Sequence, residues 1–339
     1  MDYKDNHVPP SPGYPWYDDR VTVLRDEEAP DPGWPYNTLP PRDAYDSPKK
    51  IYEYLGNHVW KQDAAKKAAS IIAYNCFERA VKSNALFVGP SGCGKTHIWR
   101  CLKDIFPDRI EIMDGSNITL DGWKGEKKWA SLLSSPIFRS SGHTILVIDE
   151  ADKMLAPRYS YGENVSNSIQ SEGLAMMEGT HVVVKDGSTS YDINTARISF
   201  VFCGAFSAKA ADMAEKDAGS RIGFGASQDR ARPYSRPMTA DDLISYGVMP
   251  EFMGRIQRIV NLEPMTVEDY YRITDSACGP MQHLWRQYRA EIHLSSQTRR
   301  ELAEEAAGSG LGIRGIENRI RGMLDDALFE DCSQRRFEF

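Results

Sequence analysis

The feature that most constrains this chain is a glycine-rich segment between a short apolar run and a helical stretch. Residues 85–88 read ALFV and predict a buried strand, whereas apolar residues return at helical spacing from Lys95 onward. Between them, residues 89–96 read GPSGCGKT, which fits the phosphate-loop pattern G-x-x-x-x-G-K-[ST]. Main-chain N–H groups in such a loop point at bound phosphates at the positive end of a helix. The segment therefore predicts a strand–loop–helix unit of an α/β protein.

The same segment predicts which residues contact a nucleotide. The Lys95 ammonium is expected to reach the β- and γ-phosphates, and the Thr96 hydroxyl is expected to ligate Mg²⁺. The alternative is a chance glycine-rich turn, which the position between a strand and a helix disfavours. The other residues of the loop and its flank that we expect to contact ATP are Pro90, Ser91, Gly92, Cys93, Gly94 and His97.

A second apolar run ends in two carboxylates. Residues 144–148 read TILVI and predict another buried strand, and Asp149 and Glu150 follow it directly. Beside a phosphate loop, Asp149 is a predicted ligand of the magnesium shell and Glu150 a predicted general base that polarises the attacking water. Taken alone, such a strand end would be a helix cap or a solvated turn. Together with the loop it predicts ATP hydrolysis, because kinases and nucleotide switches need no second carboxylate there.

Apolar periodicity divides the chain into three parts. Residues 1–47 are rich in proline, acidic and aromatic residues without periodicity, and predict an extended tail that is either disordered or a docking segment. Residues 48–263 alternate short apolar strands with helices and predict an α/β ATPase domain with a parallel central sheet. Residues 264–339 have helical spacing only, starting from a capping box at Thr266 and Asp269, and predict an all-helical lid domain.

Charge and cysteine content narrow the function classes. The formal net charge is -7 with both signs mixed along the sequence, which disfavours nucleic acid as a partner. The six cysteines form no C-x-x-C pair, so we expect a reduced, cytoplasmic protein without zinc. No apolar run approaches the ~18 residues of a membrane span, and the acidic N-terminus is unlike a signal peptide. We therefore expect neither membrane insertion nor secretion.

Beyond these two motifs, the sequence from about Ser47 to Glu330 resembles the ClpX family of hexameric protein unfoldases in the AAA+ class. The most specific stretch is residues 242–255, DLISYGVMPEFMGR. Shorter stretches match, in the same order, the family's acidic strand end, the helix end after its second pore loop and the end of its fourth core strand. These stretches are residues 148–153, 177–180 and 203–206. The resemblance implies an AAA+ P-loop NTPase fold, ATP and Mg²⁺ as cofactors, and self-assembly into a homohexamer.

The resemblance also implies roles for three residues outside the phosphate loop. Arg255 would be an arginine finger that reaches the γ-phosphate bound by the next subunit, a role suited to a guanidinium's fixed fork and permanent charge. Arg314, within the GIRG segment at residues 312–315, would be a sensor-2 arginine that contacts the nucleotide from the lid. Val59 would line the base pocket. The alternatives are a surface arginine at 255 and an ordinary first-turn arginine at 314.

Two further matches concern the work that ATP drives. Trp123 and Lys124 lie between glycines where the family has the aromatic residue of its first pore loop, which grips a threaded polypeptide. The alternative there is a turn with a half-buried tryptophan. Residues 221–225, RIGFG, resemble the loop tip that docks on the ClpP peptidase ring. An exposed isoleucine and phenylalanine in a glycine-rich loop are not expected to pack into the core of their own chain, which favours docking on a partner. The predicted docking residues are Ile222, Gly223 and Phe224.

Three departures from the family are also evident. The proline-rich segment stands where the family has a zinc-binding domain, the loop after Val184 lacks the basic cluster that attracts tagged tails, and residues 59–62 read VWKQ in place of a segment with I-G-Q. We therefore predict a reduced, diverged chaperone that threads unfolded or tagged proteins, with a ClpP-type peptidase ring as partner. The alternatives are a peptidase-independent remodeller of protein complexes and, from another class, an ATP-switched scaffold acting on nucleic acid.

Overall fold

The computed structural model divides the chain into two compact units, residues 1–40 and residues 41–339. All of the residues that the structure describes belong to the second unit. They are residues 45–116, 118, 129–140, 142–160, 163–219, 232–275, 284 and 287–339. Within these ranges, no helix combines the length and the apolar character needed to cross a membrane.

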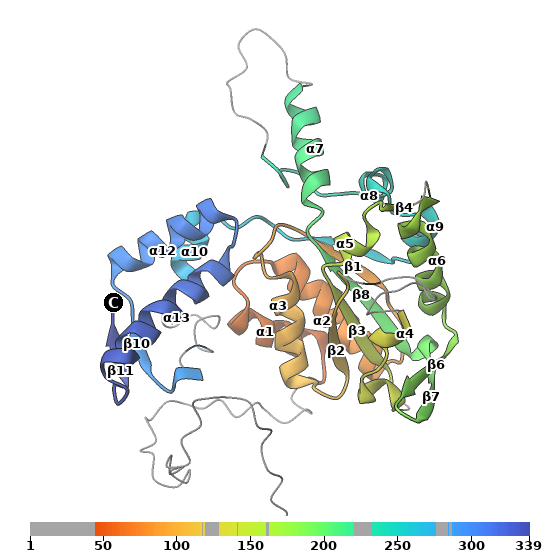
Figure 1. Ribbon diagram of the computed structural model, residues 1–339, viewed down its shortest axis with the longest axis horizontal. Helices are drawn as coiled ribbons and strands as arrows, with labels where there is room; N and C mark the ends of the chain where they lie inside the picture. The colour runs from red at the N-terminus through yellow and green to blue at the C-terminus, as the bar shows by residue number, and fades with distance from the viewer. Residues whose placement is uncertain are drawn as a thin grey trace, which may run out of the picture. The chain divides into compact units, whose positions relative to one another are not determined.

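A five-stranded parallel sheet with the order β2-β3-β8-β1-β9 forms the centre of the α/β part (Figure 1). Its neighbouring strands are all parallel, with Leu86 opposite Phe202 in one register and Ile148 opposite Phe202 in another. This confirms the predicted parallel sheet. The strands are β1 (Ala85–Val88), β2 (Ile110–Asp114), β3 (Thr144–Asp149), β8 (Ile198–Gly204) and β9 (Arg258–Asn261). The edge strand β9 was not predicted, because its four residues, RIVN, lack an apolar run.

Both faces of this sheet are covered, which explains why its strands read as unbroken apolar runs. Alternate side chains of β1 enter different cores: Ala85 and Phe87 pack with one cluster, and Leu86 and Val88 with the other. The first cluster includes α1 (Pro48–His58), α2 (Asp63–Glu78) and α3 (Lys95–Ile105). The second includes α4 (Trp129–Leu132), η2 (Pro136–Arg139), α5 (Ala151–Leu155), α6 (Val165–Glu178), α7 (Ser207–Gly219), α8 (Ala240–Tyr246) and α9 (Pro250–Met253).

Two antiparallel hairpins extend from the α/β part. One joins β4 (Tyr159–Ser160) to β5 (Glu163–Asn164), and the other joins β6 (His181–Asp186) to β7 (Thr189–Asn194). The 3₁₀ turn η3 (Thr195–Arg197) then leads directly into β8. The β6–β7 hairpin contains the short loop that follows Val184.

The C-terminal part has its own core, built on helices as predicted. The helices are α10 (Val267–Ile273), α12 (Ser296–Ser309) and α13 (Ile313–Glu330). The predicted capping box is present, because Thr266 and Asp269 exchange main-chain and side-chain hydrogen bonds. An addition to the all-helical prediction is a parallel pair of three-residue strands, β10 (Glu291–His293) and β11 (Arg336–Glu338). Strands of three residues carry too little periodicity to be recognised from the sequence.

The folded part includes residues that the sequence assigned to the tail. Tyr45 is buried, and its ring packs edge-on against Tyr54 and Phe106. Ser47 caps α1 by accepting a hydrogen bond from the Lys50 N–H. The rest of the predicted tail lies outside the described residues. At its other end, the α/β part passes into the helical part shortly after β9.

Candidate ATP-binding site

A cavity of about 320 Å³ lies where the carboxyl ends of the central strands meet the start of α13. Open parallel sheets bind ligands outside the carboxyl ends of their strands, at the point where the strand order reverses. That point lies between β1 and β8 here, because the chain leaves β1 towards β2 on one side of the sheet and leaves β8 towards β9 on the other. The predicted site residues that line the cavity are Ser91, Gly92, Gly94, Lys95, Thr96, His97, Asp149, Glu150 and Arg314.

The phosphate-loop segment connects β1 to α3 through two glycines with positive φ. Gly92 has φ of 73° and Gly94, the N-cap of α3, has φ of 100°, conformations that residues with a side chain rarely adopt. The Lys95 ammonium donates to the carbonyl oxygens of Gly89 and Pro90, at 2.7 Å in each case. The loop thus turns its main chain towards the start of α3 and keeps a buried ammonium beside it.

A hydroxyl and a carboxylate meet where α3 begins and β3 ends. The Thr96 hydroxyl donates to Asp149 Oδ1 at 2.7 Å. Magnesium prefers hard oxygen ligands and is usually held by one or two protein groups together with water and substrate phosphates. Two adjacent oxygens of this kind fit that ion. Among the described residues, no group of three or more His, Cys, Asp or Glu side chains is arranged to hold a metal by itself.

Glu150 follows the strand end in an unusual main-chain conformation. Its φ of 55° lies in the left-handed region, where a residue with a side chain is strained. Its N–H donates to Asp149 Oδ1 at 3.0 Å, and its carboxylate pairs with the Lys153 ammonium at 2.6 Å. This carboxylate raises the pKa of Lys153. The strained turn places the two carboxylates on one wall of the cavity.

The helical part approaches the phosphate loop through main chain as well as through Arg314. A Cβ atom added to Gly92 would lie 2.9 Å from Gly312 Cα and 3.0 Å from the Leu311 carbonyl oxygen. Gly312, the N-cap of α13, itself has φ of 60°. Both glycines are therefore required for this close approach of the two main chains. Arg314 lies two residues further along and lines the cavity.

Three predicted contacts do not line the cavity in this structure. Val59 is buried at the end of α1, where its carbonyl accepts a hydrogen bond from Lys66. Pro90 contributes a carbonyl to Lys95, and Cys93 is buried, which raises the pKa of its thiol. His97, which also bonds the His58 carbonyl, does reach the cavity.

Several residues of this region were not predicted from the sequence. Gln62, buried and with φ of 60°, donates from one amide nitrogen to the carbonyls of Cys93 and Glu263 and accepts from the Glu263 N–H. It thereby ties the phosphate loop to the segment that leads into the helical part. The sequence signal that could have identified it is its place in residues 59–62, VWKQ, where this chain departs from the ClpX family. Other cavity residues outside the predicted set are Arg100, Asp152, Lys153, Cys203, Gly204, Ala205, Ser207, Ile313 and Glu317.

Arg255 lies outside the cavity of its own chain. It follows α9, and its guanidinium forms an ion pair with Glu178, the last residue of α6. Both side chains are about half exposed, at 47% for Arg255 and 51% for Glu178. The structure therefore does not bring Arg255 together with the other predicted catalytic residue, Glu150.

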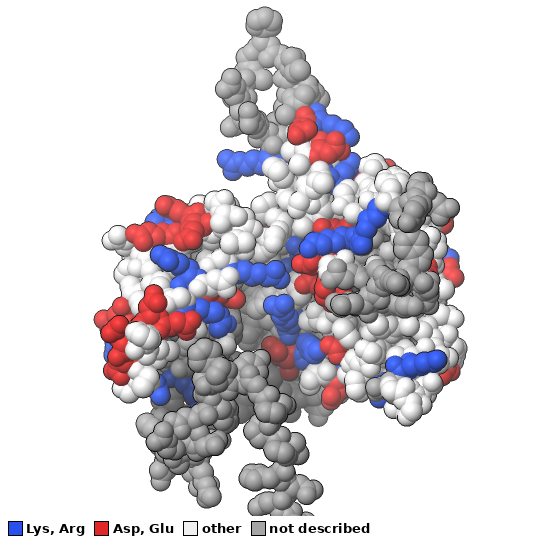
Figure 2. All heavy atoms as spheres, in the orientation of Figure 1, with Lys and Arg blue, Asp and Glu red and all other residues white. Residues whose placement is uncertain are grey.

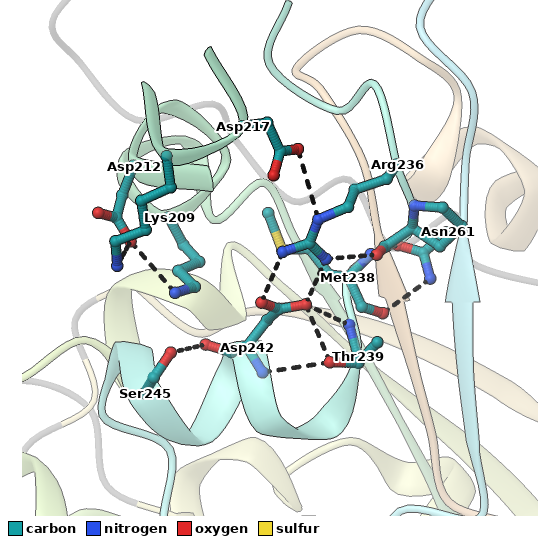
Figure 3. Close-up of polar contacts among 11 residues, drawn as sticks. Lys209, Asp212, Asp217, Arg236, Met238, Thr239, Asp242, Ser245 and Asn261 are labelled. Carbon is teal, nitrogen blue, oxygen red and sulfur yellow. Dashed lines mark hydrogen bonds and ion pairs between the residues drawn. The ribbon is translucent and has the colours of Figure 1, made fainter. Parts of the chain in front are cut away.

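The predicted pore-loop and docking residues lie outside the described residues. They are Trp123, Lys124, Ile222, Gly223 and Phe224. The described segments on either side of residues 220–231 are joined by Arg236, which binds the carboxylate of Asp242 through two nitrogens and pairs with Asp217 (Figure 3). The Arg236 guanidinium holds the pKa of Asp242 well below its usual range.

Comparison with known proteins agrees with this geometry. Residues 80–259 match the family described as AAA domain (Cdc48 subfamily). The ATP-dependent Clp protease ATP-binding subunit ClpX of Treponema denticola is 28% identical over an alignment that covers 87% of this chain and 80% of that protein. ClpX 2 of Wolinella succinogenes is 29% identical, over 84% of this chain and 77% of that protein.

The matched residues include both β1 with its phosphate loop and β3 with its two carboxylates. The chain therefore belongs to the AAA family of ATPases. Within that family it is a diverged ClpX-type AAA+ protein, an ATPase that uses nucleotide and Mg²⁺ and belongs with the ATP-dependent unfoldases.

Proposed function

We propose that this chain is a protein unfoldase that assembles into a homohexameric ring and threads polypeptides through the pore into a ClpP-type peptidase. The observation that carries the proposal is the cavity lined jointly by the phosphate loop and by Arg314 of the helical part. Because both parts contact one nucleotide site, hydrolysis there changes the contacts between them. A repeated change of this kind is what a ring needs to move a polypeptide.

In this proposal the cavity residues divide the work on ATP. Lys95 supplies positive charge to the phosphates, and Thr96 and Asp149 hold the Mg²⁺ that neutralises charge on them. Glu150 orients the attacking water and accepts its proton. Arg314 contacts the nucleotide from α13. The loop main chain around Ser91, Gly92 and Gly94 binds the phosphates, shaped by Pro90 and Cys93, while His97 and Val59 belong to the flank that faces the base.

Arg255 acts on the ATP that is bound by a neighbouring subunit rather than on the ATP of its own chain. Its place outside the cavity and its exposure support a finger that contacts ATP bound by a neighbouring copy. A guanidinium supplied in this way stabilises the charge that develops on the transferred phosphoryl group. Hydrolysis then requires the assembled ring, which is the reason to propose a homohexamer.

Trp123 and Lys124 would grip the polypeptide, and Ile222, Gly223 and Phe224 would dock on the peptidase ring. This part of the proposal rests on the resemblance of these two loops to the ClpX family and on the names of the relatives. The first alternative, a remodeller that works without a peptidase, shares every ATP residue. The second, an ATP-switched scaffold on nucleic acid, is disfavoured because acidic and basic side chains are interspersed on the visible face (Figure 2).

The proposal is tested by separating docking from threading. The double change Ile222→Ala with Phe224→Ala removes two anchors, each worth about 1.5 to 3 kcal/mol of buried apolar surface, and six loops compound the loss. It should abolish degradation of a fluorescent substrate by a ClpP-type ring while ATP-driven unfolding of that substrate continues. Trp123→Ala should keep peptidase binding and ATP hydrolysis but stop unfolding.

The matched control is Phe329→Ala, which truncates an equally large exposed side chain on α13. It should leave both degradation and unfolding at the wild-type rates. If the wild-type protein bound no ClpP-type ring at all, the peptidase partner would be abandoned and the remodeller kept.

A further inference from the structure

Asn84 lies immediately before β1, at the opposite end of the strand from the phosphate loop, and every polar atom of its side chain is used. It is 2% exposed. Its amide nitrogen donates to the Met177 carbonyl at 3.4 Å and to the Arg255 carbonyl at 3.2 Å, and its amide oxygen accepts from the Phe200 N–H at 3.1 Å. One buried amide therefore joins the last turn of α6, the start of β8 and the main chain of Arg255.

The main chain of Asn84 adds a second attachment to the same segment. The Asn84 N–H donates to the Gln257 side-chain oxygen, and the Gln257 N–H donates to the Asn84 carbonyl at 2.9 Å. The segment from Arg255 to Gln257 is thus fixed at both of its ends by one residue, just before β9 begins. The side chain of Arg255 therefore extends from a main chain whose position is fixed.

The last turn of α6 is fixed in the same way. The Lys82 ammonium donates to the carbonyls of Met176 and Thr195, at 3.1 and 2.9 Å. Carbonyl groups at a helix end lack partners within the helix, and a cation there is favourable. Glu178 ends this helix, so its carboxylate also starts from a fixed main chain.

The two fixed segments meet through one ion pair. Glu178 Oε1 accepts from both Nε, at 2.8 Å, and Nη2 of Arg255. This contact occupies one edge of the guanidinium and leaves the Nη1 end without another acceptor in the described part of the chain. Exposed ion pairs contribute little to folding stability, so stability alone does not account for such a supported pair.

We propose that Asn84 and Glu178 are positioning residues for Arg255: Asn84 fixes its main chain, and Glu178 fixes its guanidinium so that the Nη1 end faces outward towards a neighbouring subunit's ATP. The inference rests on the proposed role of Arg255 as a finger. Neither residue touches ATP in its own chain, since neither lines the cavity.

The main test compares Glu178→Ala with Glu178→Gln in ATP hydrolysis. Glu178→Ala leaves the guanidinium without its support, and misplacement of a catalytic group by about 1 Å lowers kcat by about 10²-fold. The KM for ATP should stay unchanged, because the cavity is intact. Glu178→Gln keeps an oxygen that accepts from Nε and Nη2 and should restore most of the rate. Equal rates for Glu178→Ala and wild type would overturn the proposal.

The Arg255→Ala background separates this inference from the finger itself. If Glu178 acts through Arg255, adding Glu178→Ala to Arg255→Ala should lower kcat no further. A further drop in the double variant would contradict a positioning role. If Arg255→Ala alone hydrolysed ATP at the wild-type rate, the finger assignment would fail and this inference with it. A slow Arg255→Ala beside a fast Glu178→Ala would overturn only the inference.

ATP hydrolysis by mixed rings distinguishes a positioning role of Glu178 from a purely structural one. A purely structural role predicts no restoration of hydrolysis on mixing. Glu178→Ala subunits keep a complete ATP site, whereas Lys95→Ala subunits keep a supported finger. Mixing the two should restore hydrolysis above either variant alone, and no restoration would contradict the proposal. Asn84→Asp, which keeps the oxygen for Phe200 and loses the donor for Arg255, should lower kcat in the same way, and its thermal unfolding shows whether it still folds.

Discussion

At the carboxyl end of β1, glycines with positive φ and a lysine shape a loop whose main chain faces the cavity, whereas at the amino end one buried asparagine gathers three separate segments. The first end uses main-chain conformation, and the second uses a side-chain amide. Under the proposed function, the carboxyl end binds the subunit's own ATP, and the amino end presents Arg255 to its neighbour's. One four-residue strand thus places two halves of different ATP sites.

Under this proposal, one strand contributes to two neighbouring ATP sites. The backbone of β1 is held on both sides by parallel partners and is buried throughout. A shift at one end therefore cannot be absorbed within the strand without disturbing the core, because packed interiors transmit displacement. Substitutions at the two ends of β1 should therefore impair different contributions to ATP hydrolysis.

The largest expected effect comes from the carboxyl end. Lys95→Ala should abolish nucleotide binding, because the ammonium supplies charge to the phosphates. Glu150→Gln should keep binding and lower turnover by about 10² to 10⁴-fold, the contribution of a general base. Binding of a fluorescent ATP analogue and steady-state hydrolysis measure the two quantities separately. Equal loss of binding in both variants would contradict this division of roles.

The next effect concerns Arg255, which the amino end supports. Arg255→Ala should bind ATP normally and hydrolyse it about 10³-fold more slowly, as expected for a finger supplied in trans. The measurement that distinguishes trans from cis is activity in mixtures of variant and wild-type subunits. An excess of Arg255→Ala subunits should depress wild-type activity, and unchanged activity would show that the site is not shared.

The sequence singles out the residues at the carboxyl end but not the contacts at the amino end, for a physical reason. A phosphate loop requires glycines and a lysine at fixed spacing, so all the residues of the motif lie in one contiguous segment of the sequence. The contacts of Asn84 join residues 93, 116 and 171 positions away, and nothing local in the sequence marks them. Arg255 was identified through a resemblance, whereas its partner Glu178 lay within a matched stretch without an assigned role.

The same distinction between local and long-range contacts applies to the strands of the fold. Apolar runs bounded by turn residues predicted β1 and β3, because strands buried on both faces need them. The edge strand β9 and the short strands β10 and β11 were not predicted, since pairing with a distant partner creates them. Gln62 was also missed, because its role depends on bringing residues 93 and 263 together.

A smaller effect tests whether the carboxyl end depends on main-chain proximity to the helical part. A Cβ in Gly312→Ala would lie 3.0 Å from Gly92 Cα, so the start of α13 must move away from the phosphate loop. We expect nucleotide affinity to fall by about tenfold, which corresponds to ~1.4 kcal/mol. The control is Gly310→Ala, which has a similar positive φ but nothing within 4 Å of the added atom. Equal affinity losses would assign the effect to backbone strain rather than to proximity.

The smallest effect concerns Lys82 at the amino end and is a change in stability with pH. Burial lowers the pKa of Lys82 to about 8 from 10.5. The unfolded chain therefore holds this proton more tightly than the folded chain. Between about pH 8 and 10.5 unfolding takes up a proton at this residue, so its contribution to the free energy of unfolding rises with pH.

Lys82→Met removes this titration and should flatten the rise. From about pH 8 to about pH 9, the wild-type free energy of unfolding should gain about 1 kcal/mol relative to Lys82→Met, below the ~1.4 kcal/mol that uptake of a complete proton gives over one pH unit. Urea unfolding at several pH values measures the difference, which cancels titrations common to both proteins. Lys67→Met, at an exposed position of α2, is the control and should give no such slope. If the difference between wild type and Lys82→Met were constant across this range, the ammonium would be charged in both states, and the two carbonyls at the end of α6 would offset its burial.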